Sequence, residues 1–543
     1  MKFQIIVPPS TIGSSNYPPY GAMYIAAALR QEGHAVRIEN GDTDKLDDAE
    51  LCRRVREFRP DIVGFSAIVA TSYKYVKEAS ALIRREFPDM IIMVGGGLAA
   101  ASDVLLAHTS VDYVLIGESD VTVKELVRFL AKGADCGNVD GIAFKRDGSI
   151  IKTSPRRPIS DIDSLPYPAF DLIDMDRYMI DVKRFVKGFF YYKDVDPRLF
   201  QSGRSKKILR VPLSRGCINA CTFCYRPVRG LRHFSVKYLF DYIEYMMDRF
   251  RVNVFSFGDE CFMSSKEYGW EFIAEIKRRK LDIMFHIMGT KVETVDEKLL
   301  QALKGAGCFF IEYGFESGSQ KMLDVMEKKV TVARNLEAAR ATKAAGLFTV
   351  PTIVLGMPGE TDETVRETIE FMKKLDYGSG WYQYTYAFAV PGTPLYEYGR
   401  LTHRIPDEDR YLEAIYRATP THFIESPDFV NFTAEPIGTV RRWPVMIKEE
   451  LLKHYSRNKL DYLIRKYLRS EIFFFYMKRN GIRKTLQKIL KSLSGLKTGA
   501  GAAVPQDVRY DAAVGGERGE SLRKVIDRLK ERSEEGLYIK ASN

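Results

Sequence analysis

Three cysteines, Cys217, Cys221 and Cys224, lie within eight residues of a 543-residue chain that has seven cysteines in all. Two thiols would suffice for a disulfide, and a closed structural zinc site needs four ligands. Three thiolates can instead hold three irons of a 4Fe-4S cluster and leave the fourth iron open. The spacing therefore predicts a cluster with one open coordination position. A zinc site completed by Cys261 or His233 is the alternative.

The elements that must position these cysteines form a series of six strand–helix units. The strands are expected at ILRVPLS, VNVFSFGDE, LDIMFHIMG, CFFIEYGFESG, FTVPTIVLGMPGE and WYQYTYAFAVPGTPLY. Six such units fit a partial (β/α)6 barrel of the TIM type, whose chemistry gathers at the carboxyl ends of the strands. The cysteines follow the first of these strands, at such an end.

A second α/β unit is expected before the barrel. Five short apolar strands alternate with helical patterns, at FQIIVP, HAVRIEN, DIVGFS, MIIMVGGG and DYVLIGES. This alternation predicts a parallel, doubly wound, Rossmann-like sheet that binds its ligand at the carboxyl ends of the strands. Small residues at those ends would let a bulky ligand approach the backbone, although ordinary tight loops have the same composition.

The chain is expected to divide into several parts, because one core seldom organises so many residues. They are the Rossmann-like domain (1–140), a connecting segment (141–205), the barrel (206–400), a basic helical region (401–495), and a flexible linker with a charged tail helix (496–543).

Most of the excess positive charge lies in one segment. The net charge is +11, and residues 441–500 contain 16 Lys and Arg against 4 Asp and Glu. Amphipathic stretches there suit peripheral contact with an anionic membrane, or packing on the barrel. The apolar stretch EIFFFYM within the segment argues against nucleic acid as the partner.

The compartment is expected to be the cytoplasm. The amino terminus lacks the pattern of a signal peptide, and no apolar run is long enough to span a membrane. The four remaining cysteines are scattered singly, which is typical of a reducing environment.

The cysteine motif, with Phe223 preceding Cys224, resembles the signature of the radical S-adenosylmethionine (SAM) superfamily. The resemblance implies that the open iron chelates SAM, and that one electron cleaves SAM to a 5′-deoxyadenosyl radical. It also implies a small-molecule substrate and a one-electron donor of the flavodoxin or ferredoxin kind. Three further stretches resemble SAM-binding motifs, one of them with Asp259 in place of a glycine. They place SAM contacts at Gly258, Asp259, Glu260, Glu316, Ser317, Gly356, Gly359 and Glu360.

The first domain resembles the cobalamin-binding domain that precedes the barrel in one class of these enzymes. This resemblance implies cobalamin contacts at Tyr20, Gly21, Ser66, Thr71, Ser72, Gly95, Gly96, Gly97, Gly117 and Glu118. The Asp-x-His-x-x-Gly motif of many cobalamin-binding domains is absent, so no protein histidine is expected on the cobalt.

Together the two resemblances imply a cobalamin-dependent radical SAM enzyme, and most directly a C-methyltransferase that acts on an unactivated carbon. In that reaction one SAM supplies the radical and a second recharges methylcobalamin. The alternative is a radical cyclase or ring-rearranging enzyme similar to the anaerobic magnesium-protoporphyrin IX monomethyl ester cyclase. A methylthiotransferase fits less well, because the first domain lacks a second cysteine trio. A non-catalytic cobalamin or redox sensor would not need an open iron.

Overall fold

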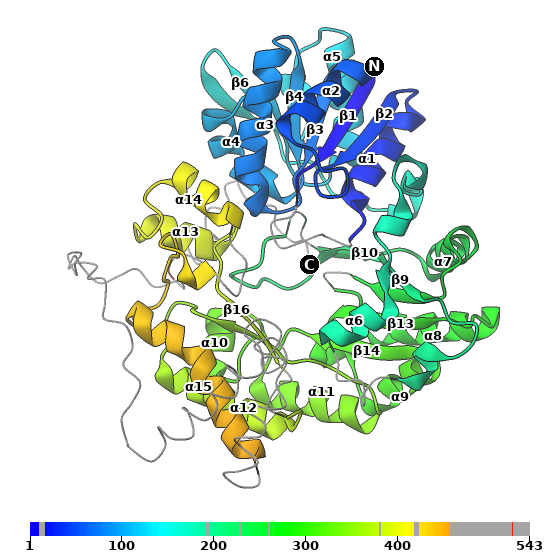
Figure 1. Cartoon of the computed structure of the whole chain (residues 1–543), viewed down its shortest axis with the longest axis vertical. Helices are drawn as coiled ribbons and strands as arrows, with labels where there is room; N and C mark the ends of the chain where they lie inside the picture. Colours follow the sequence, from blue (N-terminus) through cyan, green and yellow to red (C-terminus); the bar gives the residue numbers. More distant parts are fainter. Residues whose placement is uncertain are drawn as a thin grey trace, which may run out of the picture.

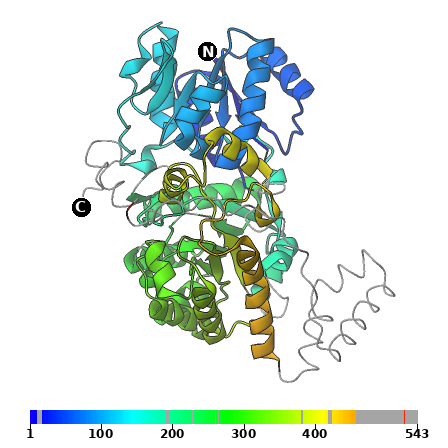
Figure 2. The same cartoon turned by 90° about the vertical axis from the view of Figure 1, so that its left-hand side faces the viewer.

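The computed structural model describes residues 1–9, 17–189, 196–226, 228, 230–258, 261–263, 265–378, 382–417, 423–456 and 524. An amino-terminal α/β domain lies above a second α/β body, with short helices from later in the chain at their junction (Figure 1). The view turned by 90° shows the same arrangement (Figure 2). The expected order of two α/β units is confirmed.

The first domain is a doubly wound sheet with strand order β2-β1-β3-β4-β5-β6-β7. Its first five strands are parallel: β1 (Lys2–Val7), β2 (Ala35–Asn40), β3 (Ile62–Ser66), β4 (Ile91–Gly95) and β5 (Tyr113–Leu115). One face packs on α1 (Tyr20–Gln31) and α5 (Ser119–Ala131). The other packs on α2 (Asp48–Phe58), α3 (Tyr73–Glu86) and α4 (Ser102–His108). Burial on both faces explains why these strands read as continuous apolar runs.

The sheet continues beyond residue 140, where the connecting segment was expected to begin. The antiparallel hairpin of β6 (Ile142–Arg146) and β7 (Ser149–Lys152) extends it through β5. The sequence DGIAFKRDGSIIK has the alternation of an edge hairpin around a turn. This pattern differs from the continuous apolar runs that predicted the parallel strands.

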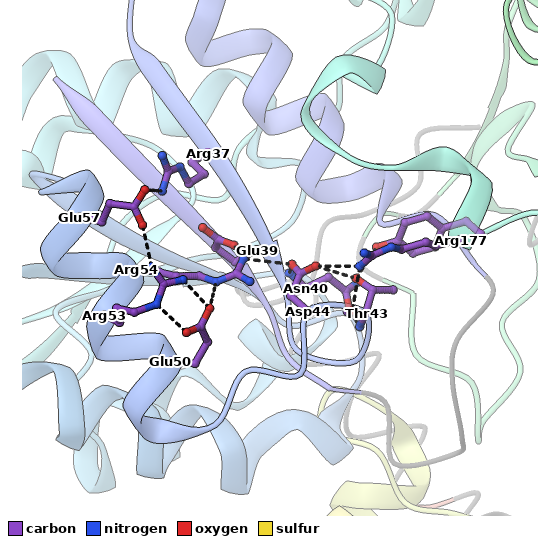
Figure 3. A network of polar contacts seen from close by, with 11 residues as sticks. Arg37, Glu39, Asn40, Thr43, Asp44, Glu50, Arg53, Arg54, Glu57 and Arg177 are labelled. Carbon is purple, nitrogen blue, oxygen red and sulfur yellow. Dashed lines mark hydrogen bonds and ion pairs between the residues drawn. The ribbon is translucent and has the colours of Figure 1, made fainter.

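The rest of the connecting segment is fastened to the first domain by a polar network after β2 (Figure 3). Asn40 Oδ1 accepts hydrogen bonds from the backbone N–H groups of Asp42 (2.9 Å) and Thr43 (3.2 Å), which closes the turn. Arg177 then donates to the carbonyl oxygen of Thr43 (2.9 Å) and to Asp44 Oδ1 (3.3 Å). The connection therefore has fixed contacts with the domain that it leaves.

The second body contains six parallel strands, as predicted for a partial barrel: β9 (Lys207–Val211), β12 (Val254–Phe257), β13 (Met284–Thr290), β14 (Cys308–Tyr313), β15 (Thr352–Leu355) and β16 (Gln383–Tyr386). Parallel bridges from Phe310 to Phe348 and from Glu316 to Ile353 join the β14 and β15 segments. A short antiparallel strand, β8 (Ile180–Asp181), lies beside β9 and precedes α6 (Val182–Phe189).

Helices between these strands form the outer layer, and caps mark where several of them begin. They are α7 (Val236–Phe250), α8 (Lys266–Arg279), α9 (Glu297–Gly305), α10 (Gln320–Val325), α11 (Val332–Ala344) and α12 (Asp362–Leu375). Ser235 caps α7 and Thr361 caps α12, and each side chain accepts a hydrogen bond from a backbone N–H of the first turn.

Helices α13 (Pro394–Leu401), α14 (Glu408–Ala414) and α15 (Ile437–Tyr455) follow the last strand in the described part of the chain. Helices α13 and α14 pack against the first domain, where Lys77 of α3 forms ion pairs with Asp409 (2.7 Å) and Glu413 (2.9 Å). Helix α15 packs against α12. Among the described residues, no helix combines the length and hydrophobicity needed to cross a membrane.

The two bodies are joined by ion pairs between α5 and a hairpin that carries the first cysteine. In this hairpin, β10 (Ser214–Cys217) pairs with β11 (Gly230–His233), so Arg215 and Arg232 stand opposite each other. Asp120 binds Arg215 through two contacts of 2.7 and 3.1 Å, and Glu118 binds Arg232 through contacts of 2.7 and 2.9 Å. All four side chains are less than 20% exposed. Two like charges opposite each other repel, and the carboxylates offset this repulsion.

Replacing Asp120 by Ala should destabilise the protein strongly, since it leaves the buried Arg215 without its bidentate partner. The expected cost is on the order of 3–5 kcal/mol. Adding Arg215→Met should recover part of that loss, because it removes a buried charge whose remaining acid, Glu118, lies 3.6 Å away and already binds Arg232. Thermal unfolding of the single and double variants measures both effects. The control is Asp103→Ala, which removes the exposed ion pair with Lys152. If the midpoint falls equally in Asp120→Ala and Asp103→Ala, the joint does not stabilise the structure.

Candidate active site

A cavity of 760 Å³ lies between the two bodies, at the carboxyl ends of the strands of the first sheet. Nine of the ten predicted cobalamin contacts line it: Tyr20, Gly21, Ser66, Thr71, Gly95, Gly96, Gly97, Gly117 and Glu118. The tenth, Ser72, is buried and is not part of the lining. The cysteine hairpin supplies Ser214, Arg215 and Gly216 to the other wall. A bulky ligand here would touch both bodies at once.

The Gly95–Gly97 run has two different roles. A Cβ atom on Gly97 would lie 2.2 Å from the carbonyl oxygen of Ile68, and one on Gly96 would lie 2.5 Å from that of Ala67. These glycines are therefore needed where the loops after β3 and β4 cross. Only Gly95, whose added Cβ would have no neighbour closer than 3.8 Å, has open space beside it.

Glu118 reaches the cavity wall but is fully engaged in the joint. Besides Arg232, its carboxylate accepts a hydrogen bond from the backbone N–H of Ile159 (2.8 Å). Its contribution to this site is to hold the hairpin in place. The sequence motif GES predicted the position of the residue but could not indicate its partner, which lies 114 residues away.

No histidine lines the large cavity in the part of the chain that the structure describes. The lining is largely apolar and aromatic, with Tyr17, Tyr20 and Tyr24 from the start of α1 and the segment before it. Size, position and lining fit cobalamin as a ligand, and the absence of an axial histidine stays a prediction.

The three cysteines line a second cavity, of 220 Å³, at the carboxyl ends of the barrel strands. Cys217 and Cys221 are buried and Cys224 is exposed. Thr222 anchors the loop between them, since its N–H and Oγ1 donate to the carbonyl oxygens of Met326 (3.0 Å) and Val325 (3.1 Å). Its own carbonyl accepts from Leu395 N–H (3.0 Å), which ties the loop to α13.

The electrostatics of this cavity suit thiolate ligands. A hydrogen bond with Cys261 is the main cause that lowers the pKa of Cys217 to about 6, with Arg226 and Lys328 adding to the effect. Burial raises the pKa of Cys221, the opposite direction. Two polar atoms on the wall, Thr290 Oγ1 and Asn335 Oδ1, are buried and have no hydrogen-bond partner among the residues that the structure describes. The donor set and the unsatisfied polar atoms fit a cluster together with a polar ligand.

The zinc alternative depends on a fourth ligand. Cys261 lines the cavity with the three cysteines, whereas His233 is not part of the lining and stacks on Tyr268 with 4.1 Å between ring centroids. Within the described ranges, no three His, Cys, Asp or Glu side chains are already arranged to hold a single metal ion.

The predicted SAM contacts fall into four groups. Phe223 and Glu316 line the cysteine cavity, and Gly258 lines the large cavity. Asp259 and Glu260 lie outside the described residues. Ser317 is buried, with its Oγ 3.1 Å from Thr368 Oγ1. Ser317, Gly356, Gly359 and Glu360 line neither cavity, and the Glu360 carboxylate accepts a hydrogen bond from the backbone N–H of Gly356.

Lys328 is a residue of this site that the sequence did not single out. Its Nζ lies 2.7 Å from Glu316 Oε1, and both side chains are less than 20% exposed. Glu316 has a positive φ of 60°, which turns its side chain back toward Gly314 and Lys328. The stretch MEKKV has no pattern that distinguishes one lysine from the other, so only the folded chain identifies Lys328.

The two cavities share a wall at two consecutive residues. Cys224 lines the cysteine cavity, and the next residue, Tyr225, lines the large one. The Tyr225 ring fills the space beside Gly392 and Gly97, where a Cβ on either glycine would come within 2.7 and 3.6 Å of it. Ligands in the two cavities would therefore be neighbours.

Gly97→Ala should lower the thermal stability of the protein even without cobalamin, because the new methyl group must displace the Ile68 carbonyl. The expected cost is about 1–3 kcal/mol. Gly95→Ala is the matched control from the same loop, and its methyl group fits without a clash. Thermal unfolding of both variants without added cofactor tests this. Equal midpoints would show that the loop crossing does not require Gly97.

The wild type should lose stability as the pH rises from about 5 to about 8, and Glu360→Gln should abolish this loss. Burial raises the pKa of Glu360 to about 8, above its ordinary value of 4.5. The folded state thus binds the proton more tightly than the unfolded state, so stability falls as the pH rises through this window, by at most about 1.4 kcal/mol per unit. Thermal midpoints from pH 5 to pH 8.5 should diverge in favour of the variant. The exposed neighbour Glu363, changed to Gln, is the control; parallel curves for wild type and Glu360→Gln would contradict the assignment.

Comparison with known proteins identifies both bodies. A family model described as "Radical SAM superfamily" matches residues 211–372, and one described as "B12 binding domain" matches residues 13–127. A protein of Pyrococcus horikoshii named "Uncharacterized methyltransferase PH0819" is 30% identical over 73% of this chain and 83% of its own length. The anaerobic magnesium-protoporphyrin IX monomethyl ester cyclase of Rubrivivax gelatinosus is 27% identical over 68% of this chain and 65% of its own length.

Solved structures share the fold. The cobalamin-dependent SAM radical enzyme OxsB has a TM-score of 0.62 at 16% identity, over 99% of this chain and 84% of its own. The radical SAM methyltransferase TsrM of Kitasatospora setae has a TM-score of 0.56 at 18% identity, over 72% and 74%. With both domains matched in the expected order, the chain belongs to the radical SAM enzymes that carry an amino-terminal B12-binding domain.

Proposed function

We propose that this enzyme transfers a methyl group from SAM, by way of cobalamin, to an unactivated carbon of a small molecule. The observation that carries the proposal is the shared wall, because Cys224 and Tyr225 bring the cysteine cavity and the large cavity into contact. A reaction that used only the SAM radical would not need a cobalamin site so close.

Each part of the chain has a defined task in this proposal. The bound cluster would supply one electron to SAM, and bound cobalamin would carry the methyl group. Cys217, Cys221 and Cys224 would hold the cluster, while Thr290 and Asn335 offer hydrogen bonds to a polar ligand beside it. Lys328 balances the charge of Glu316 at the same wall. Glu118 and Asp120 keep the cysteine hairpin against the cobalamin domain through their ion pairs with Arg232 and Arg215.

The electron donor and the membrane are further parts of the proposal. A flavodoxin- or ferredoxin-like protein would deliver the electron near the exposed Cys224. Peripheral membrane contact through residues 441–500 stays a prediction. The described part of that segment belongs to α15, whose Trp443, Ile447 and Leu451 are buried against the barrel. The two amphipathic stretches lie outside the described residues.

Incubation with methyl-labelled SAM, a low-potential reductant and a cell extract tests the proposal. The reconstituted enzyme should form 5′-deoxyadenosine and S-adenosylhomocysteine together, and the label should appear on carbon in a product. The Cys217→Ala/Cys221→Ala/Cys224→Ala variant should lose the cluster absorbance and both nucleosides, since it lacks all three thiolates. Cys52→Ala is its control, because Cys52 is a buried cysteine of the first domain that lines neither cavity.

The same experiment distinguishes methyl transfer from the cyclase alternative, which the cyclase relatives suggest. A cyclase or ring-rearranging enzyme would form 5′-deoxyadenosine in response to its substrate, without stoichiometric S-adenosylhomocysteine and without label in the product. That result would overturn methyl transfer while leaving the radical SAM assignment intact. A full cluster in the triple cysteine variant would overturn the ligand assignment.

A further inference from the structure

The barrel lumen contains a row of polar side chains that none of the cofactor contacts uses. Along β9, β12 and β13, Leu209, Phe255 and Phe285 pack outward with the helices. The next residue on each strand, Arg210, Ser256 or His286, points to the opposite side, which is the lumen. Arg210 is in register with Ser256, and Ser256 with His286, so the three lie in one layer of the barrel.

Two members of this row, Ser256 and His286, contact each other, and His286 also lies near Glu312. Ser256 Oγ lies 3.0 Å from His286 Nδ1, and His286 Nε2 lies 3.4 Å from Glu312 Oε1 on β14. The His286 ring is 1% exposed and stacks on Phe310, with 4.4 Å between ring centroids. This chain of contacts holds the imidazole and the carboxylate in fixed positions.

Arg210 is different, because its charge has no ion pair within 4.0 Å in the described part of the chain. Its Nε is buried without a hydrogen-bond partner, and burial lowers the pKa of its guanidinium. Arg210 as a whole is half-buried, and Glu312 acts on its charge without forming an ion pair with it. The unpartnered Nε is a donor that an anion could use. Planar guanidinium groups bind carboxylates and phosphates with two parallel hydrogen bonds.

The guanidinium lies directly behind the wall of the large cavity. The Tyr17 ring lies 5.9 Å from Arg210 Cζ, and Tyr17 also lines that cavity. The Tyr17 hydroxyl donates to the carbonyl oxygen of Gly258 (2.8 Å), at the carboxyl end of β12. A molecule anchored on Arg210 would thus lie beside Tyr17, on the far side of this wall from the large cavity.

We propose that Arg210 binds an oxyanion of the substrate, a carboxylate or a phosphate, within the barrel lumen, and that the substrate is consequently an acidic, water-soluble small molecule. Ser256 and His286 are buried, and their part is to hold Glu312 in place beside it. The inference rests on the proposed function, since it takes the lumen as the place of reaction. It also goes beyond it, because it assigns the chemical class of the substrate.

The test uses the reconstituted holoenzyme with methyl-labelled SAM and three fractions of a cell extract. These are the metabolites retained on an anion exchanger, the metabolites that flow through, and the chloroform-soluble lipids. The retained fraction should stimulate 5′-deoxyadenosine formation above the basal rate. Treatment of that fraction with alkaline phosphatase distinguishes the two sources of the oxyanion, because it abolishes the stimulation for a phosphate and leaves it for a carboxylate.

Arg210→Gln should raise the concentration of this fraction needed for half-maximal stimulation by about 10-fold or more, as expected for the loss of charge-assisted hydrogen bonds. Cluster content, cobalamin content and basal SAM cleavage should not change. Arg210→Lys keeps the charge and should be affected less. Lys207→Gln, on the same strand but paired with Asp176 at the surface, should behave as wild type.

Several results would overturn the inference. They are failure of the anionic fraction to stimulate, stimulation by the lipid or flow-through fraction alone, and equal behaviour of Arg210→Gln and Lys207→Gln. Loss of cobalamin in Arg210→Gln would instead place the guanidinium on the cofactor. If Arg210→Gln impairs stimulated 5′-deoxyadenosine formation but no product carries the label, the result supports the anion site and contradicts methyl transfer.

Discussion

Arg215 and Arg232 face each other across the β10–β11 hairpin, and they can do so only because Asp120 and Glu118 neutralise them. The hairpin begins the cysteine loop, while both acids belong to the start of α5 in the first domain. Arg215 also lies over the Tyr24 ring, at 4.8 Å, so α1 contributes to the same contact. The position of the cysteines relative to the first sheet therefore depends on charges supplied from the other domain.

The arrangement of the cavities follows from this joint. Because the hairpin is held against the carboxyl ends of β3, β4 and β5, it forms one wall of the large cavity, and the cysteine loop continues from it into the barrel. Thr222 then fixes that loop to α10 and α13 through three backbone and side-chain contacts. One short segment, from Arg215 to Tyr225, thus touches both domains and both cavities, so ligands bound in the two cavities would be neighbours.

The barrel beneath combines an apolar outer face with a polar inner row. Phenylalanines such as Phe255, Phe257 and Phe285 pack among the helices and make the scaffold rigid. The inner positions of the same strands hold groups that a purely structural barrel would fill with Val, Ile or Leu. Keeping Arg210, His286 and Glu312 inside costs stability, and a polar substrate gives a physical reason for that cost.

The sequence alone determined the features that depend on local pattern: two α/β units in order, strands with buried faces, and a cysteine spacing that limits the metal chemistry. These are properties of neighbouring residues, and nine of the ten residues predicted to contact cobalamin line the large cavity. It did not determine roles that depend on distant partners. Glu118 binds a hairpin 114 residues later, Gly97 is required by the Ile68 carbonyl, Glu360 is buried behind its turn, and Lys328 becomes part of the site through Glu316. A side chain's role is set by the groups that surround it after folding, and only the tertiary structure brings those groups together.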